Sequence, residues 1–162
     1  MRKILLPLFA IILLAGTSCK TETNIEKEQE AILEALYQQS EAFISGDLEK
    51  SFAVHTQDSL ETRLEMGPYS YNVLKGWDEI RSLLVDAAPG FVHSGAVNTK
   101  ENVIMKVMGN CAWLTCDNVW KWDMDDGTDG FASIQVVFLE KIKGEWKISF
   151  SSYYNKAVPV AN

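Results

Sequence analysis

The stretch VVFLEKIKGEWKISFSSYY, residues 136–154, contains two strand patterns joined by a tight turn at Lys143-Gly144. Both arms are rich in the β-branched and aromatic residues that strands prefer. Three more segments with strand character precede this hairpin, at 91–99, 102–109 and 111–124. The second half of the chain therefore predicts a meander of antiparallel strands.

Helical patterns occupy the chain before these strands. Apolar residues recur at helical spacing from Asn24 to Ser45, which predicts a long helix. Thr23 followed by Glu26 fits a capping box at its start, and Gly46 is placed to end it. A short second helix is expected over residues 48–55.

The segment between the helical patterns alternates in the manner of a strand. Residues 58–66 present one apolar face, residues 67–76 are expected to form a loop, and residues 77–88 predict a third helix. Helices first and strands afterwards indicate an α+β fold, with three N-terminal helices on one face of an antiparallel sheet.

The first residues of the chain predict export. Residues 1–18 have a basic start, a short apolar run and small residues at the exit, as signal peptides do. Cys19 follows directly and resembles the lipidated cysteine of bacterial lipoproteins, with residues 19–23 as a short tether. The alternative is ordinary secretion, with Cys19 a chance residue. By the same resemblance, Lys20 favours a lipid-anchored protein of the cell envelope, at the outer membrane.

The charge balance argues against a nucleic-acid partner. Among 162 residues, 15 Lys and Arg stand against 22 Asp and Glu, a net charge of -7, whereas binding to phosphates needs clustered cations. The composition fits one globular domain, which we place at residues 24–156 with a tail at 157–162.

The two cysteines in the predicted sheet are not expected to pair. On one strand, Cys111 and Cys116 would lie roughly 17 Å apart on opposite faces, which is too far for a disulfide. We interpret both as small buried hydrophobic residues. Nothing near them resembles a set of metal ligands, and the sequence indicates no cofactor.

The stretch WKWDMDDGTDGF, residues 120–131, raises the question of a calcium loop. The spacing fails, because an EF-hand loop starting at Asp123 or Asp125 would need a side chain with an oxygen ligand where Gly127 stands. Asp-Gly and a second glycine are typical of hairpin turns. We favour a turn, with weak Ca²⁺ binding by the clustered carboxylates as the open alternative.

Three segments together resemble a known family. FISGDLEKSFAVHTQD at 43–58, LKGWDEI at 74–80 and the closing hairpin at 136–154 resemble, in order and spacing, the SnoaL-like branch of the nuclear transport factor 2-like superfamily. The resemblance covers residues 24–156. It implies a cystatin-like α+β cone, in which a strongly curved antiparallel sheet wraps three helices and leaves a ligand pocket at its open end.

The resemblance also indicates where site residues would lie. The oxyanion tyrosine of the superfamily's steroid isomerases corresponds to Gln39 and the base to Arg63, and a guanidinium does not accept a proton. Ser152 stands where several SnoaL-like proteins carry a histidine. His55 and Asp58 remain as an acid–base pair, if a tight turn brings them together. The alternative is that each satisfies local backbone groups.

The aromatic residues suggest two surfaces. Trp113 and Trp120 differ by an odd number and face opposite sides of a strand; we expect Trp113 inside the cone and Trp120 with Trp122 outside. Since members of the superfamily commonly pair through the sheet, an aromatic outer face favours a homodimer. Tyr69, Tyr71 and Trp77 would border the pocket mouth, so ligand contacts are assigned to Tyr69, Tyr71, Trp77 and Trp113, with plain packing as the alternative.

These features favour a cell-envelope lipoprotein that binds a small apolar or amphipathic molecule, or a protein partner, without catalysis. Two histidines, His55 and His93, are few for acid–base chemistry. A SnoaL-like cyclase, isomerase or hydrolase using His55 and Asp58 is the alternative. A structural module acting through the outer sheet face is the third reading.

Overall fold

The computed structural model describes residues 24–92, 94–124 and 127–155 of the chain. The predicted signal peptide, Cys19 with its predicted lipidation, the tail and His93 lie outside the described residues. No helix in the described part of the chain is long and apolar enough to cross a membrane.

The first two helices lie at the predicted places, but the first is capped by Asn24 rather than by the predicted Thr23, and the second, predicted over residues 48–55, ends at Phe52. Helix α1 spans Ile25–Ser45, and Gly46 ends it in the left-handed conformation with φ 80°. The N-cap is Asn24, whose side chain accepts a hydrogen bond from the backbone N–H of Lys27 at 3.2 Å. Helix α2, Leu48–Phe52, begins at the predicted Asp47 cap.

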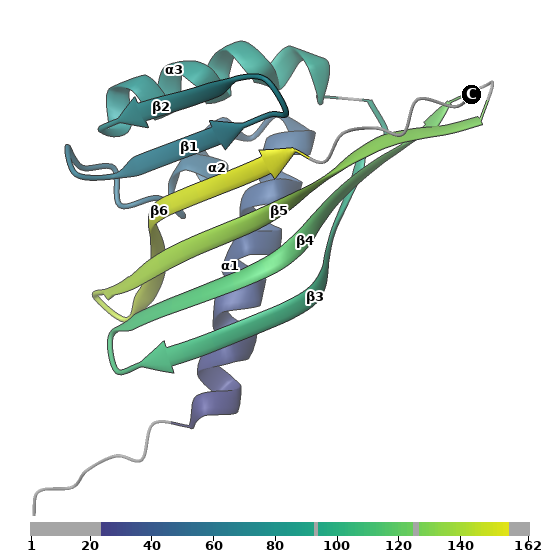
Figure 1. Cartoon of the computed structure of the whole chain (residues 1–162). Helices are drawn as coiled ribbons and strands as arrows, with labels where there is room; N and C mark the ends of the chain where they lie inside the picture. Colours follow the sequence, from purple (N-terminus) through teal and green to yellow (C-terminus); the bar gives the residue numbers. More distant parts are fainter. Residues whose placement is uncertain (1–23, 93, 125–126, 156–162) are drawn as a thin grey trace, which may run out of the picture.

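The sheet has six strands, and it is mixed rather than antiparallel as predicted. In spatial order they are β2, β1, β6, β5, β4 and β3 (Figure 1). Strand β1 runs parallel to β6, while all the other neighbours are antiparallel. The bounds are β1 Thr62–Met66, β2 Tyr71–Lys75, β3 Val97–Met108, β4 Cys111–Met124, β5 Gly127–Ile142 and β6 Glu145–Asn155.

Two sequence assignments around the edge strands are wrong. The segment predicted as a loop at 67–76 contains β2, which pairs with β1 in a hairpin. In place of the two strands predicted at 91–99 and 102–109 there is one strand, β3, which begins only at Val97. It has a register shift between Glu101 and Ile104, where Asn102 adopts φ 51°. Such a bulge bends a strand and increases its twist.

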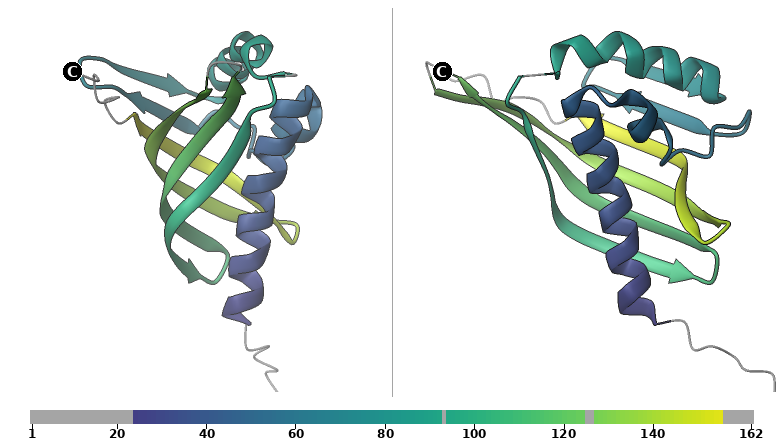
Figure 2. Two further views of the ribbon diagram at one scale, coloured as in Figure 1. Left: turned by 90° about the vertical axis from the view of Figure 1, so that its right-hand side faces the viewer. Right: turned by 180° about the vertical axis from the view of Figure 1, so that it is seen from behind.

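Helix α1 packs along the concave face of the curved sheet (Figure 2). Ile32 and Leu36 of α1 are buried against Leu114, Val137 and Ile148, which come from three neighbouring strands. This apolar core fills the lower half of the cone. Burying each such side chain contributes about 1.5–3 kcal/mol, so the helix is held mainly by this stripe.

A charged cluster closes the narrow end of the cone. The Glu28 carboxylate of α1 accepts hydrogen bonds from Lys141 Nζ at 2.6 Å and from Trp146 Nε1 at 2.8 Å. The hydrogen bond from Lys141 is the main reason that the pKa of Glu28 lies below its usual value. The cluster ties the start of α1 to strands β5 and β6.

The third helix and a short 3-10 turn cover the wide end. Helix α3, Trp77–Ala87, lies above β1 and β2 (Figure 1), and the turn η1, Ala88–Gly90, ends it at the predicted Pro89. Ile80 and Leu84 of α3 are buried with Phe43 of α1. The three helices therefore lie on one side of the sheet, although α3 follows β1 and β2 in the chain.

The two faces of β4 are the reverse of the prediction. Ala112, Leu114 and Cys116 are buried on the concave side, and Trp120 shares their parity. Trp113 therefore faces the convex side. The prediction that the two tryptophans face opposite sides of the strand is confirmed, but the predicted side is wrong for each of them.

The cysteines are free, as predicted, and lie on opposite faces of β4. Cys116 is a buried residue, whereas Cys111 is exposed, so the expectation of burial is wrong for Cys111.

The acidic stretch is a hairpin. Strands β4 and β5 pair as far as Met124 opposite Gly127, so they form the predicted hairpin, whose turn at residues 125–126 lies outside the described residues. Near this end, a Cβ atom on Gly130 would overlap the carbonyl oxygen of Trp120 and come within 3.2 Å of Lys121 Cα. Glycine is therefore required at position 130, where the backbone of the neighbouring strand leaves no room for a side chain.

Candidate binding cavity

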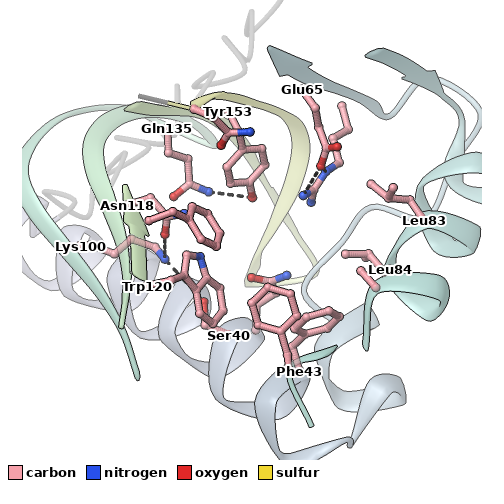
Figure 3. Close-up of a pocket in the computed structure, with 16 residues that line it drawn as sticks. Ser40, Phe43, Glu65, Leu83, Leu84, Lys100, Asn118, Trp120, Gln135 and Tyr153 are labelled. Carbon is pink, nitrogen blue, oxygen red and sulfur yellow. Dashed lines mark hydrogen bonds and ion pairs between the residues drawn. The ribbon is translucent and has the colours of Figure 1, made fainter. Parts of the chain in front are cut away.

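A cavity of about 220 Å³ opens between helices α1 and α3 and the concave face of the sheet (Figure 3). It lies above the core, where α1 diverges from the upper part of the strands. The helices contribute Gln39, Ser40, Phe43, Leu83, Leu84 and Ala87 to its lining.

One wall of the cavity is aromatic. The ring of Phe91 packs edge-on against Trp120 with centroids 5.0 Å apart, and against Phe43 at 5.3 Å. Phe131 continues the wall, stacked near Trp120 at 6.4 Å. Together with Leu84, these side chains offer a surface for an apolar group.

Next to Trp120, the polar part of the lining carries a lysine held by uncharged groups (Figure 3). Lys100 of β3 donates from Nζ to Asn118 Oδ1 at 2.8 Å and to Asn98 Oδ1. Ser40 Oγ of α1 lies 3.5 Å from the same nitrogen. The amide groups are themselves linked, since Asn98 Nδ2 donates to Asn118 Oδ1 at 2.9 Å.

Burial lowers the pKa of Lys100 to about 8, since the charged amine is removed from water. The same cause raises the pKa of the neighbouring Cys116 thiol to about 11. Both groups therefore favour their uncharged forms more than they would at the surface.

A second polar group stands in the middle of the sheet. Gln135 of β5 donates from Nε2 to the hydroxyl of Tyr153 at 2.9 Å. The Arg63 guanidinium lies over the Tyr153 ring, 4.3 Å from its centroid, and donates from Nη2 to Glu65 Oε1 at 2.8 Å. Arg63 and Glu65 neutralise each other, so Lys100 is the charge in the lining that has no partner of opposite sign among the described residues.

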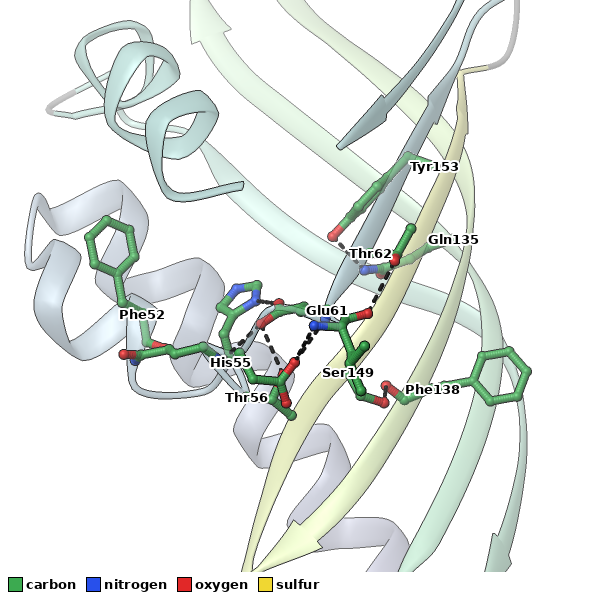
Figure 4. A network of polar contacts seen from close by, with 12 residues as sticks. Phe52, His55, Thr56, Glu61, Thr62, Gln135, Phe138, Ser149 and Tyr153 are labelled. Carbon is green, nitrogen blue, oxygen red and sulfur yellow. Dashed lines mark hydrogen bonds and ion pairs between the residues drawn. The ribbon is translucent and has the colours of Figure 1, made fainter. Parts of the chain in front are cut away.

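The structure does not bring His55 and Asp58 together. The partner of His55 is Glu61, whose Oε1 lies 2.5 Å from Nδ1 (Figure 4), and the two residues are only 4% and 2% exposed. Asp58 Oδ1 instead accepts the backbone N–H groups of Leu60 and Glu61 at 2.7 and 2.9 Å. Asp58 therefore fits the alternative interpretation of the sequence, in which it forms hydrogen bonds with nearby backbone groups.

The His55–Glu61 pair belongs to the scaffold. Glu61 Oε2 also accepts from Thr56 Oγ1 at 3.1 Å and from the Gln57 backbone N–H at 3.0 Å. His55 packs against Trp77 with ring centroids 5.2 Å apart, and neither His55 nor Glu61 lines the cavity. The geometry gives no support to acid–base catalysis by His55 and Asp58.

The residues predicted to contact a ligand lie elsewhere. Tyr69 and Tyr71 are 100% and 81% exposed on the β1–β2 hairpin. Trp77 packs on Phe52 and His55, and Trp113 lies on the convex face, so these four residues are not among those that line the cavity. The plain-packing alternative fits Trp77.

The sequence analysis did not single out Lys100, and it assigned the two faces of β4 the wrong way round. The correct assignment could have been made, because Asp117 and Lys121 lie on the same face of the strand as Trp113, and charged residues favour the solvent side of a sheet. Gln39 and Arg63, the positions that correspond to the isomerase residues, both line the cavity. In the described part of the chain, no cluster of three His, Cys, Asp or Glu side chains is arranged to hold a metal ion.

Comparison with known proteins gives one family and many similar structures. The model of the SnoaL-like domain matches residues 31–153. Among functionally curated proteins, none matches the sequence.

Three solved structures illustrate the shared fold. A nuclear transport factor 2-like protein with a cystatin-like fold from Novosphingobium aromaticivorans is 14% identical, with a TM-score of 0.66 over 84% of this chain and 86% of that one. A putative dehydratase of the same family from Streptomyces avermitilis is 16% identical, with a TM-score of 0.65 over 83% and 99%. The association domain of CaMKII from C. elegans is 16% identical, with a TM-score of 0.64 over 79% and 95%.

The buried charge of Lys100 predicts a pH-dependent cost to stability. Below pH about 8 the folded protein must bury a charged ammonium group, which lowers its free energy of unfolding. This cost to stability falls as the pH rises above 8 and vanishes near pH 10.5, the ordinary pKa of a lysine. Lys100→Met removes the charge, while the two amide oxygens keep Ser40 Oγ and Asn98 Nδ2 as donors. Because Lys100 keeps some contact with water, we expect the variant to gain about 1–2 kcal/mol near neutral pH.

Urea unfolding at a series of pH values measures this difference. The matched control is Lys106→Met, on the exposed face of the same strand, which should change stability little. A Lys100→Met protein that is less stable than the wild type at every pH would contradict the assignment.

Proposed function

The chain belongs to the SnoaL-like domain family, and we propose that it binds a small amphipathic molecule in the cavity without acting as an acid–base enzyme. The observation that carries this proposal is the division of the cavity into an aromatic wall and a polar wall. Such a division orients a ligand that has one apolar end and one polar group.

The size of the cavity limits the ligand. A dry cavity of about 150 Å³ accommodates benzene. A volume of about 220 Å³ therefore admits one ring with a short polar substituent. The ring would lie against Trp120 and Phe91, and the substituent would reach Lys100 or the hydroxyl of Tyr153.

Catalysis through the proposed acid–base pair has little to support it. His55 is buried outside the cavity and is bonded to Glu61, while Asp58 holds a backbone turn. In the cavity itself, Arg63 and Glu65 are occupied by each other. Binding therefore accounts for the site better than a SnoaL-like cyclase, isomerase or hydrolase does.

The convex face of the sheet supports a homodimer as part of the same proposal. Half-exposed apolar side chains lie on several of its strands, and Phe138 packs edge-on against Phe150 with ring centroids 5.7 Å apart. Exposed apolar side chains gathered on one face of a sheet favour an interface there. Its exposed apolar members include Val73, Ile104, Ile134, Phe138 and Tyr154.

The N-terminal sequence supports a lipid anchor at Cys19, in the cell envelope. A single domain that begins at α1 could then stand off the membrane on the short tether at 19–23. Since one acyl chain anchors weakly, stable attachment at this cysteine requires more than one chain.

Filling the cavity should abolish binding. Ala87 lines the cavity on α3, so Ala87→Trp should place an indole in the space that a ligand would occupy. With cinnamyl alcohol as the probe, we expect isothermal titration calorimetry to show at least a roughly tenfold loss of affinity, equivalent to about 1.4 kcal/mol. Val85→Trp on the exposed side of the same helix is the matched control, and equal loss in both variants would argue against binding in the cavity.

A charge on the convex face should separate the dimer. Ile134 is 42% exposed on the sheet and Val85 is 39% exposed on α3. We expect Ile134→Glu to shift sedimentation towards the monomer, because a buried carboxylate would be left unpaired, and Val85→Glu to leave it unchanged. A wild-type protein that sediments as a monomer at micromolar concentration would contradict the proposed dimer.

Loss of Cys19 should release the protein from the membrane. In cells that express the full chain, we expect wild-type protein in the detergent phase after phase separation and Cys19→Ala in the aqueous phase. Cys111→Ala is the matched control, since Cys111 lies on the folded domain. Equal partitioning of wild type and Cys19→Ala would favour ordinary secretion.

A further inference from the structure

The amine of Lys100 has an unusual set of neighbours for a buried lysine. Its hydrogen-bond partners are two amide oxygens and a hydroxyl, and the described lining offers it no carboxylate, because Glu65 is taken by Arg63. Buried lysines are ordinarily paired with an opposite charge. The neutral form of the amine is therefore easier to reach here than at a surface.

The geometry suits a neutral amine with its lone pair available. A neutral amine has two hydrogens, and the oxygens of Asn98 and Asn118 can accept both. The third neighbour, Ser40 Oγ, is at 3.5 Å, the limit of a hydrogen bond, and its own hydrogen is directed to Leu36 O or to Asn98 Oδ1. The remaining position on the nitrogen is thus only loosely occupied, in the wall of the cavity.

We propose that Lys100 captures an amphipathic aldehyde or ketone by forming an imine with it in the cavity. This inference rests on the proposed function, because the aromatic wall must first hold the apolar part of the carbonyl compound. It adds a chemical class of ligand and a covalent bond to that function.

The reaction balances without an oxidant or a reductant. The nitrogen lone pair forms a bond to the carbonyl carbon, and a proton passes from nitrogen to oxygen to give a carbinolamine. The nitrogen lone pair then forms the carbon–nitrogen double bond as the carbon–oxygen bond breaks, and the departing hydroxide takes the remaining N–H proton and leaves as water. The products are one imine and one water, and hydrolysis releases the ligand by the reverse path.

The pKa of Lys100 supports this chemistry. Lowering the pKa from 10.5 to about 8 raises the neutral fraction at pH 7 by roughly 300-fold. The titratable groups that face Lys100 are Tyr37 of α1, whose hydroxyl accepts the Lys100 backbone N–H at 3.4 Å, and Cys116 of β4. Across the cavity stand Tyr153 and the Arg63–Glu65 pair.

Reductive trapping tests the proposal. The purified protein is incubated with cinnamaldehyde and sodium cyanoborohydride, which reduces an imine to a stable secondary amine, and peptide mass spectrometry locates the modified lysines. We expect one adduct per chain, with Lys100 labelled at least roughly tenfold faster than any other lysine at pH 7. The rate should rise with pH and level off above about 8.

Three variants sharpen the result. Lys100→Gln should lose the fast adduct, while the same substitution at Lys106, exposed on the same strand, should keep it. Lys100→Arg keeps a positive charge but offers no nucleophilic amine at this pH, so it should lose the adduct as well. Ala87→Trp should block labelling by filling the cavity.

Other outcomes separate this inference from the proposed function. Equal labelling of all lysines, or an adduct that survives in Lys100→Gln, overturns the imine. Cinnamate that binds equally well to wild type and Lys100→Arg, with no trapping of the aldehyde, would make Lys100 an anion-binding residue and also overturns it. If cinnamyl alcohol binds and no Lys100 adduct forms, the cavity still binds ligands; if neither occurs, both proposals fail for this class of molecule.

Discussion

The packing of one face of helix α1 against the concave sheet determines both the core and the cavity. Along this face, Ile32 and Leu36 are buried apolar residues that fill the lower cone. One turn later Ser40 takes the place of a large apolar residue, and its hydroxyl lies within hydrogen-bond distance of two acceptors, Leu36 O and Asn98 Oδ1. On one face of α1, side chains that fill the core are thus followed by side chains that line the cavity. The helix that stabilises the domain therefore also forms part of the site.

Local patterns predicted the local structure of this chain well. Helix α1 and its end at Gly46, the cap at Asp47 and the hairpin at 143–144 depend on neighbouring residues, and the structure has all of them. The parallel pairing of β1 with β6 joins residues 62–66 to 150–154, and nothing in either segment encodes a partner so distant. That pairing is what makes the sheet mixed.

The site was harder to predict than the fold, because it depends on parity and on contacts across the chain. A strand displaced by one residue exchanges its faces, so one wrong assignment for β4 moved Trp113 inside and Trp120 outside. His55 could not be paired by spacing alone, since the turn at Gln57, with φ 59°, directs Glu61 rather than Asp58 towards the imidazole. A lysine in a strand is ordinarily expected at the surface. Only the pairing of Lys100 with Asn118 across the two strands shows that its amine is held in the lining of the cavity.

The placement of β1 beside β6 has a consequence for the order of assembly. Residues 62–66 leave the ribosome long before their partner at 150–154, so this parallel ladder cannot close until the last strand has emerged. Closing so long a loop is entropically costly and slow. The helices and the β3–β4–β5 meander can form earlier from nearby residues, but the wide end of the cone, where the cavity lies, is completed last.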